Sequence, residues 1–383
     1  MNFRENIKNA KRVVFKFGTN ALTREDGEIA LSRIYSFIES ISELKKLGKE
    51  IIIVTSGAVG MGMKKLGLDS KPVLVTLKQA CAAIGQGELM YIYEEGFKKF
   101  SIITAQILLT EEDFSVRRKY LSLRSTLNHL LELGVVPIIN ENDTVSTSEL
   151  QSFNTDGIMV CFGDNDKLSA LVMSKLDADL LIIMSDVDGL YDDDPRVNKK
   201  AKVISVIKEI TPEIENLGFE ASKMGRGGMK TKLEAAKVAV RSGGMAIIAN
   251  GKKPDTITKL FNNENIGTVF LPVENLSSKK RWIAYATTIF GKIKVNEGAQ
   301  KALVKNNSSL LSAGIVEIKG RFKEGDVISI IDETNMEFAR GIVNYSSSEC
   351  KKVIGKHSDE IEKILGYKNY DAVISRDNIV ILS

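Results

Sequence analysis

A lysine in an apolar segment and a basic, glycine-rich segment much further along the chain both suit phosphate binding. Lys16 lies in VVFKFGTN (13–20), where an unpaired ammonium group would be costly. Its amine either reaches solvent beyond a strand end or binds an anion there. SKMGRGGMKTK (222–232) places three glycines and four basic residues before and within the first turn of an expected helix. Cations oppose the helix dipole at that end unless an anion lies between them; the alternative is a solvated basic turn.

Two other segments place hydroxyl or acidic groups directly after an apolar run. TSGAVG (55–60) combines hydroxyl groups with glycine N–H groups, which suits a phosphate or a carboxylate, although Ser56 could instead cap a helix. SDVDGLY (185–191) offers Asp186 as an acceptor for a ribose and Tyr191 as an apolar surface for a base, or it forms a plain surface loop. The second segment extends the prediction from phosphate to a whole nucleotide.

Acidic and amide residues cluster at two further places. NEND (140–143) ends an apolar run, and GDND (163–166) precedes a helical pattern. Turn composition alone explains Asn and Asp there, and one of Asp164 and Asp166 is expected to cap the helix. If the two clusters lie at neighbouring strand ends, they could also bind an ammonium group or a metal ion. The residues alone leave these alternatives open.

A mainly parallel sheet is expected to bring these segments together. Apolar, β-branched runs predict strands at 13–17, 51–55, 102–109, 135–139, 180–185 and 245–249. Helical patterns lie between them at 31–47, 116–133, 167–175 and 229–241. This alternation predicts an α/β fold with helices on both faces of the sheet. In such folds ligands bind at the carboxyl ends of the strands, which is where the polar segments lie.

A smaller domain is predicted after the sheet. Residues 1–272 would form the α/β domain, 273–282 a polar and basic linker, and 283–383 a compact β-barrel-like domain. Gly, Asn and Asp turns separate its predicted short strands at 291–295, 314–318, 326–331, 338–343, 372–374 and 379–382. Helices are predicted at 299–305 and 346–354.

Composition excludes several classes of protein. The 383 residues carry a net charge of +4, an excess too small to indicate a nucleic-acid or membrane protein. No apolar run approaches the roughly 18 residues that span a bilayer, and the charged N-terminus lacks the apolar stretch of a signal peptide. With two histidines and three widely spaced cysteines, a Ser-His triad or a His-rich metal site is not expected. We expect a cytoplasmic protein.

The ordered motifs resemble a known family. No Walker A loop, GxGxxG fingerprint or protein-kinase motif set is present, so the phosphate site has another architecture. Taken in order, KFGTN, TSGAVG, NEND, GDND, SDVDGLY and GRGGMKTK resemble the amino acid kinase superfamily, and within it the glutamate 5-kinase branch. Segments 281–303, 308–330 and 339–347 resemble the PUA domain that bacterial members carry.

The resemblance implies a fold and a reaction. The fold is a three-layer αβα sandwich with a mainly parallel central sheet, followed by a small β-barrel-like PUA domain. The reaction is ATP-dependent phosphorylation of the γ-carboxylate of L-glutamate to γ-glutamyl phosphate, the first step of proline biosynthesis, with Mg²⁺ accompanying ATP as co-substrate. The resemblance also implies a homo-oligomer, either a dimer or a tetramer, and feedback inhibition by proline.

The family's residue roles can be transferred to matching positions. The resemblance implies catalytic roles for Lys16, Lys232 and Asp166, the last positioning the two lysines. It implies glutamate contacts at Ser56, Asp143 and Asn165, and it leaves the metal ligands open. It implies ATP contacts at Lys16, Ser185, Asp186, Arg226, Gly227, Gly228, Met229, Lys230, Thr231 and Lys232. The chain departs from the family pattern in segment 144–165, which is longer than in typical bacterial members. This segment joins two glutamate-binding motifs, so the family pattern does not fix the local geometry there.

Two alternative functions remain at this stage. A sibling kinase acting on acetylglutamate or aspartate shares the core, although the GDND motif and the PUA-like domain favour glutamate. An RNA-binding protein acting through the PUA domain is an alternative of another class. Lys319, Arg321 and Lys323 could form a small basic patch on one strand, but a solvated strand face explains them as well. Tight RNA binding is not expected, because it requires a concentrated basic surface.

Overall fold

The chain forms two compact units in the computed structural model, one built by the described residues up to 272 and the other by those from 280 onward. The structure describes residues 3–68, 70, 72–145, 165–218, 228–272, 280, 283–284 and 289–382. No helix in these ranges is long and apolar enough to cross a membrane.

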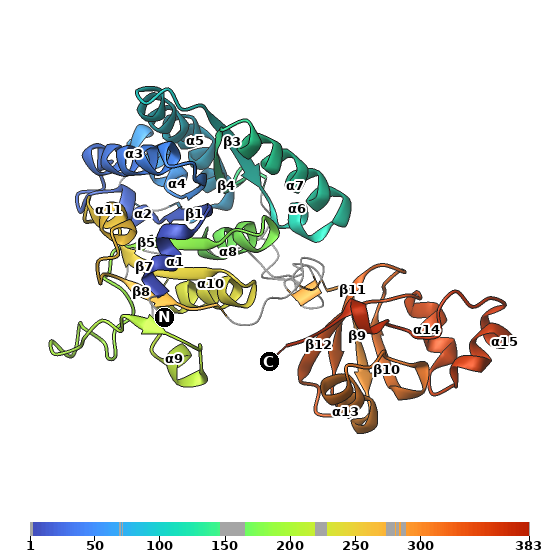
Figure 1. Cartoon of the computed structure of the whole chain (residues 1–383). Coiled ribbons are helices and arrows are strands. Elements are labelled where there is room, and N and C mark those ends of the chain that lie inside the picture. The colour runs from blue at the N-terminus through green and yellow to red at the C-terminus, as the bar shows by residue number, and fades with distance from the viewer. Residues whose placement is uncertain are drawn as a thin grey trace. The chain divides into compact units, whose positions relative to one another are not determined.

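An eight-stranded sheet forms the centre of the first unit (Figure 1). Its order is β3-β4-β2-β1-β5-β7-β8-β6, and every pairing is parallel except that of β7 with β8. The strands are β1 (Arg12–Phe17), β2 (Glu50–Thr55), β3 (Thr104–Leu109), β4 (Val136–Glu141), β5 (Leu180–Ser185), β6 (Val206–Ile207), β7 (Met245–Asn250) and β8 (Thr268–Phe270). The predicted mainly parallel sheet is confirmed.

Helices cover both faces of this sheet (Figure 1). The helices of the first unit are α1 (Phe3–Asn9), α2 (Thr19–Leu22), α3 (Leu31–Lys46), α4 (Ala58–Lys65), α5 (Val75–Lys98), α6 (Glu111–Ser115), α7 (Arg117–Glu132), α8 (Asn165–Lys175), α9 (Pro212–Asn216), α10 (Met229–Arg241) and α11 (Thr256–Phe261). The three-layer αβα class is therefore confirmed. The helix predicted at 229–241 and the strand predicted at 180–185 have the same bounds in the structure.

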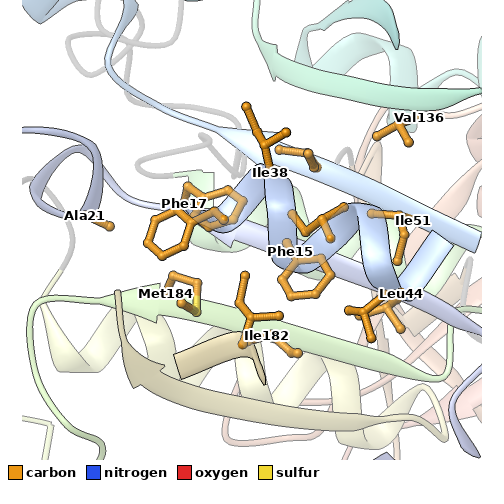
Figure 2. Close-up of a cluster of buried hydrophobic side chains, with 14 of the residues drawn as sticks. Phe15, Phe17, Ala21, Ile38, Leu44, Ile51, Val136, Ile182 and Met184 are labelled. Carbon is orange, nitrogen blue, oxygen red and sulfur yellow. The ribbon is translucent and has the colours of Figure 1, made fainter. Parts of the chain in front are cut away.

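Side chains alternate along β1, so that apolar rings lie on one face of the sheet and a lysine lies on the other. Phe15 and Phe17 belong to the core cluster that includes residues of α3, such as Phe37, and Figure 2 shows both rings among its apolar side chains. Phe17 stacks on Phe37 with a centroid distance of 4.9 Å. Because successive strand residues point to opposite faces, Lys16 lies on the other face, toward α8 and α10.

Helices α4 and α5 approach each other so closely that only glycine fits at two positions. A Cβ atom at Gly62 would lie 1.8 Å from the Cys81 carbonyl oxygen, and one at Gly85 would lie 1.8 Å from the Ala58 carbonyl oxygen. Neither distance is compatible with a side chain, and both obstacles are backbone atoms. The contact therefore fixes α5 against the first residue of α4.

The second unit contains a separate five-stranded sheet of order β10-β9-β11-β12-β13, in which only β9 and β11 are parallel. Its strands are β9 (Gly291–Val295), β10 (Ile315–Gly320), β11 (Val327–Ile331), β12 (Glu337–Ile342) and β13 (Ile379–Ile381), and its helices are α13 (Glu297–Asn306), α14 (Ser347–Val353) and α15 (Ile361–Leu365), with 3-10 turns η2 (Ser312–Gly314), η3 (Ser358–Glu360) and η4 (Arg376–Asn378). The small, β-rich second domain is confirmed. The strand predicted at 372–374 is wrong, because Ile374 makes only an isolated bridge to Leu310.

Candidate active site

Lys16, Asp166 and Lys232 form a buried cluster in the first unit. Lys16 Nζ lies 2.6 Å from Asp166 Oδ1, and Lys232 Nζ lies 3.1 Å from Asp166 Oδ2. Asp166 is fully buried, while Lys16 and Lys232 are 3% and 7% exposed. Lys16 does not reach solvent, so that alternative for its side chain is wrong. Two cations and one anion leave one net positive charge, which suits a negatively charged ligand.

Three different elements supply this cluster. Lys16 comes from β1 and Asp166 is the second residue of α8, where the positive end of the helix favours a carboxylate. Lys232 lies in the first turn of α10, where the same dipole disfavours an ammonium group. The Asp166 carboxylate offsets that conflict. Because α8 begins at Asn165, Asp166 is not its cap, and Asp164 lies outside the described residues.

A second group of polar atoms surrounds the end of β2. Asn165 Nδ2 lies 2.6 Å from the Thr55 carbonyl oxygen and 2.8 Å from Ser56 Oγ. The Thr55 carbonyl can only accept, so it fixes the amide nitrogen of Asn165 on that side. Asn165 Oδ1 then remains as a buried acceptor, and it has no hydrogen-bond partner among the described residues. An acceptor of this kind suits the ammonium group of an amino acid.

The turn between β2 and α4 requires glycine. Gly57 has φ +108°, a left-handed conformation that side chains rarely adopt, and it is the N-cap residue of α4. No side chain caps this helix, so Ser56 does not act as a cap. Its hydroxyl group instead contacts Asn165. At the end of β4, Asp143 is half-buried and lies two residues beyond the strand.

The end of β5 carries the residues predicted to contact a nucleotide. Ser185 is buried and its Oγ lies 3.2 Å from Asp186 Oδ1, while Asn20 Nδ2 donates to Asp186 Oδ2 at 2.9 Å. Nearby, a hydrogen bond from Lys253, supplemented by one from Asn250, lowers the pKa of Asp188. The carboxylates at this strand end are therefore held by amide and ammonium groups.

The glycine-rich segment is described from Gly228 onward. Gly228 is the N-cap residue of α10, Met229 is half-buried and Lys230 is exposed. Thr231 Oγ1 lies 3.0 Å from Asp166 Oδ2, so the start of α10 contacts the buried cluster through two consecutive residues, Thr231 and Lys232. Arg226 and Gly227 lie outside the described residues, as does most of segment 144–165.

Comparison with known proteins shows the family of the chain. Residues 11–250 match the amino acid kinase family and residues 291–365 match the PUA domain. A glutamate 5-kinase of Thermoanaerobacter sp. (strain X514) is 48% identical over 97% of this chain and 98% of its own length. The chain belongs to the glutamate 5-kinase branch of the amino acid kinase family.

Further relatives extend this similarity across distant organisms. A glutamate 5-kinase of Methanosarcina barkeri (strain Fusaro) is 45% identical over 99% of this chain and 98% of its own length. One of Moorella thermoacetica is 42% identical over 98% of this chain and 97% of its own length. Among solved structures, carbamate kinase from Giardia lamblia bound to AMP-PNP is matched with 16% identity and a TM-score of 0.48, over 70% of this chain and 100% of that one.

Several residues around the site were not assigned individually from the sequence. Asn140, at the end of β4, is buried and accepts from Asn165 at 3.0 Å. Tyr93 on α5 contacts Thr55 through a hydroxyl–hydroxyl hydrogen bond of 3.0 Å, and burial raises the pKa of its phenol, which keeps it protonated. NEND pointed to Asn140 as one of four candidates. Nothing in the sequence pattern of 75–98 indicated Tyr93.

Proposed function

We propose that the chain transfers the γ-phosphoryl group of ATP to the γ-carboxylate of L-glutamate at this site. The product is γ-glutamyl phosphate, and the reaction opens proline biosynthesis. One observation carries the assignment to this site: two buried ammonium groups from different elements converge on one carboxylate, beside an amide and hydroxyl site for an amino acid. The family of the chain supplies the identity of the substrates.

The chemistry fits a site without a general base. The side-chain carboxylate of glutamate, with an ordinary pKa of about 4.3, is ionised at neutral pH and needs no deprotonation before it attacks. The main obstacle is the repulsion between this carboxylate and the phosphates of ATP. Lys16 and Lys232 offset that repulsion by binding the transferring group from two sides. Catalysis then consists of placement and electrostatic stabilisation.

Asp166 is proposed to position the two lysines rather than to take a proton. One carboxylate oxygen holds each ammonium group, which fixes the separation of the two cations before the substrates bind. A preorganised pair of cations does not have to reorient as charge moves during the transfer. Thr231 adds a hydroxyl contact to the same carboxylate and limits its rotation.

The other residues divide between the two substrates. Ser56, Asp143 and Asn165 are proposed to bind glutamate. Those proposed to contact ATP are Lys16, Ser185, Asp186, Arg226, Gly227, Gly228, Met229, Lys230, Thr231 and Lys232. The described residues contain no cluster of three or more Asp, Glu, His or Cys residues that would hold a metal. Mg²⁺ is proposed to accompany ATP as co-substrate, and no protein ligand is assigned to it.

A hydroxylamine trap tests the reaction directly, because hydroxylamine converts an acyl phosphate to a coloured hydroxamate. We expect product with ATP, Mg²⁺ and L-glutamate together, and none when ATP or glutamate is left out. N-acetylglutamate and aspartate, assayed in parallel, test the sibling activities. Faster product formation with either of them than with glutamate would contradict the substrate assignment.

The remaining expectations are also proposals. The kinase domain is proposed to span 1–272 and the PUA domain 283–383, with a linker at 273–282. Proline is proposed as a feedback inhibitor, the protein as a dimer or tetramer in the cytoplasm, and the PUA domain as one that does not bind RNA tightly. Adding proline to the hydroxylamine assay tests the feedback inhibition. Light scattering of the purified protein tests the oligomeric state.

A further inference from the structure

We propose that Gln86 on α5 is a positioning residue for the amino-acid substrate, acting through Asn140 on Asn165. This inference rests on the proposed function, because it assigns Gln86 to the glutamate side of the site. Asn140 Nδ2 donates to Gln86 Oε1 at 2.8 Å, and Asn165 Nδ2 lies 3.0 Å from Asn140 Oδ1. Three side-chain amides thus form a continuous chain from α5 to the substrate site.

The direction of this chain is fixed by the backbone. The Glu141 N–H donates to Asn140 Oδ1 at 2.9 Å, and a backbone N–H cannot become an acceptor. Rotating the Asn140 amide by half a turn would therefore bring two donors together. Asn140 must present its oxygen to Glu141 and Asn165, and its nitrogen to Gln86. Gln86 Oε1 is the acceptor that stabilises this orientation.

The same chain determines which atom of Asn165 is left for a ligand. Asn165 Nδ2 faces Asn140 Oδ1, Ser56 Oγ and the Thr55 carbonyl oxygen. All of these oxygens can accept, so the nitrogen stays among them and Oδ1 is directed away from them. If the Asn140 amide turned, its nitrogen would compete for the position next to Asn165. The Glu141 N–H opposes that rotation from one side of the amide, and Gln86 Oε1, which accepts from Asn140 Nδ2, adds to it from the other.

Helix α5 is held in place to make this contact. Gly85, the neighbour of Gln86, lies so close to the Ala58 carbonyl that a Cβ atom there would be 1.8 Å from the oxygen. Ala58 is the first residue of α4, directly after the Ser56–Gly57 turn. Gln86 is therefore carried by a helix whose distance from the substrate turn is set by backbone contact.

Gln86 is a poor choice for stability alone. It is nine-tenths buried, and its Nε2 has no hydrogen-bond partner among the described residues. An unpaired buried amide group destabilises the folded state, and leucine at this position would avoid that cost. The contact that justifies an amide here is the one from Oε1 to Asn140.

Gln86→Leu tests the inference in the full chain. Loss of the acceptor should raise the glutamate KM about tenfold, as expected for one buried hydrogen bond, with the ATP KM and kcat within about twofold of wild type. Gln86→Glu keeps an acceptor oxygen at the same place and should restore the glutamate KM to within about threefold. Ser174→Ala is the matched control: it also removes a buried polar atom without a partner in the described structure, on α8, and should change neither KM.

A double-mutant cycle separates positioning from general packing. In an Asn165→Ala background, Gln86→Leu should add less than about twofold to the loss in kcat/KM for glutamate, because its effect passes through Asn165. Additive losses, an unchanged glutamate KM in Gln86→Leu, equal rises in both KM values, or a Glu variant no better than Leu would each overturn the inference. If the wild-type chain forms no hydroxamate from glutamate, the proposed function itself fails, which is a different result.

Discussion

The two units of the chain differ in whether their described residues include buried charged side chains. In the first unit, several charged side chains are buried, namely Arg4, Lys16, Lys49, Lys78, Asp166, Lys175 and Lys232. In the described part of the second unit, the buried polar residues are the neutral Ser312, Ser329 and Asn344. Lys319 and Glu317, which form one of its ion pairs, lie on the surface. Among its described residues, the second unit therefore builds its sheet without burying a charged side chain.

The buried charges of the first unit include two different kinds. Lys49 donates to the carbonyl oxygens of Lys8 and Ala10 at 2.6 Å each, which ties the N-terminal helix to the sheet. Such a lysine satisfies backbone acceptors and has a structural purpose. Lys16 and Lys232 instead meet a carboxylate near the carboxyl ends of the strands, where a pair of apolar residues would fold as well or better. The contrast supports the proposal that this cluster serves chemistry.

Removing one ammonium group should give the largest effect. Lys16→Met keeps an unbranched side chain of similar volume but removes the charge that faces Asp166. We expect turnover in the hydroxylamine assay to fall about a thousandfold, because stabilisation of the transferring group depends on it. Lys319→Met on the second unit is the matched control and should leave turnover unchanged. Near wild-type turnover in Lys16→Met would end the assignment of Lys16 to catalysis.

Removing the carboxylate should affect stability as well as activity. Asp166→Asn leaves two buried ammonium groups facing a neutral amide. The free energy of unfolding should fall by about 3–5 kcal/mol, the usual result of leaving buried charge uncompensated. Urea denaturation followed by circular dichroism measures this. An Asn variant as stable as wild type would show that the cluster is more hydrated than its burial indicates, and would weaken the contrast between the units.

The α4–α5 contact tests whether the first unit is built to hold its site in place. Gly62→Ala would bring a methyl group to 1.8 Å from the Cys81 carbonyl oxygen, so the helices must separate. We expect a loss of about 2–3 kcal/mol in the free energy of unfolding. Gly60→Ala, in the same helix, meets nothing within 4 Å and should stabilise by about 0.5–1 kcal/mol through its helix propensity.

Readouts of function sharpen that test. If the contact also positions the substrate turn, the Gly62→Ala variant should show a higher glutamate KM with little change in the ATP KM. Gly60→Ala should show neither change. Equal stability of the two variants would mean that the helices are free to move apart, and α5 would then be a poor support for the site.

Strands and helices with strong periodicity could be predicted from the sequence. The run LLIIMS in β5 is apolar throughout, and the stripe of Leu233, Ala236 and Val240 marks α10 clearly. The strand at 372–374 failed for a tertiary reason: its residues pair with Leu310 at a single bridge instead of a neighbouring strand. Local β propensity carries no information about whether a partner strand exists.

Helix α5 shows why part of the site could not be predicted. Small residues such as Cys81 and Gly85 face α4, so the apolar stripe that usually marks a helix is weak here. Gln86 and Tyr93 lie on this unpredicted element, and both contact strand ends. The sequence indicated Lys16, Asp166 and Lys232 as candidate site residues, because each lies where an expected strand ends or an expected helix begins. The predicted parallel sheet brought their segments to the same edge, and the family resemblance added that Asp166 positions the two lysines, which joins residues up to 216 positions apart.

A surface ion pair should give the smallest effect and completes the contrast with the buried cluster. Glu297 and Lys301 lie four residues apart on α13, with a 2.6 Å contact between side chains that are 70% and 61% exposed. We expect Glu297→Gln to change Tm by less than about 1 °C, because exposed pairs gain little from their attraction.

The same pair should respond to pH and to salt. The hydrogen bond from Lys301 lowers the pKa of Glu297. The stability that the pair contributes is therefore present above the ordinary pKa of a glutamate and is lost as the pH falls through the lowered pKa of Glu297. In 1 M salt the Tm difference between Glu297→Gln and wild type should vanish. The stability lost in Asp166→Asn should persist, since ions screen exposed charges far more than buried ones. If salt removed both effects alike, the buried cluster would have to be treated as another surface pair.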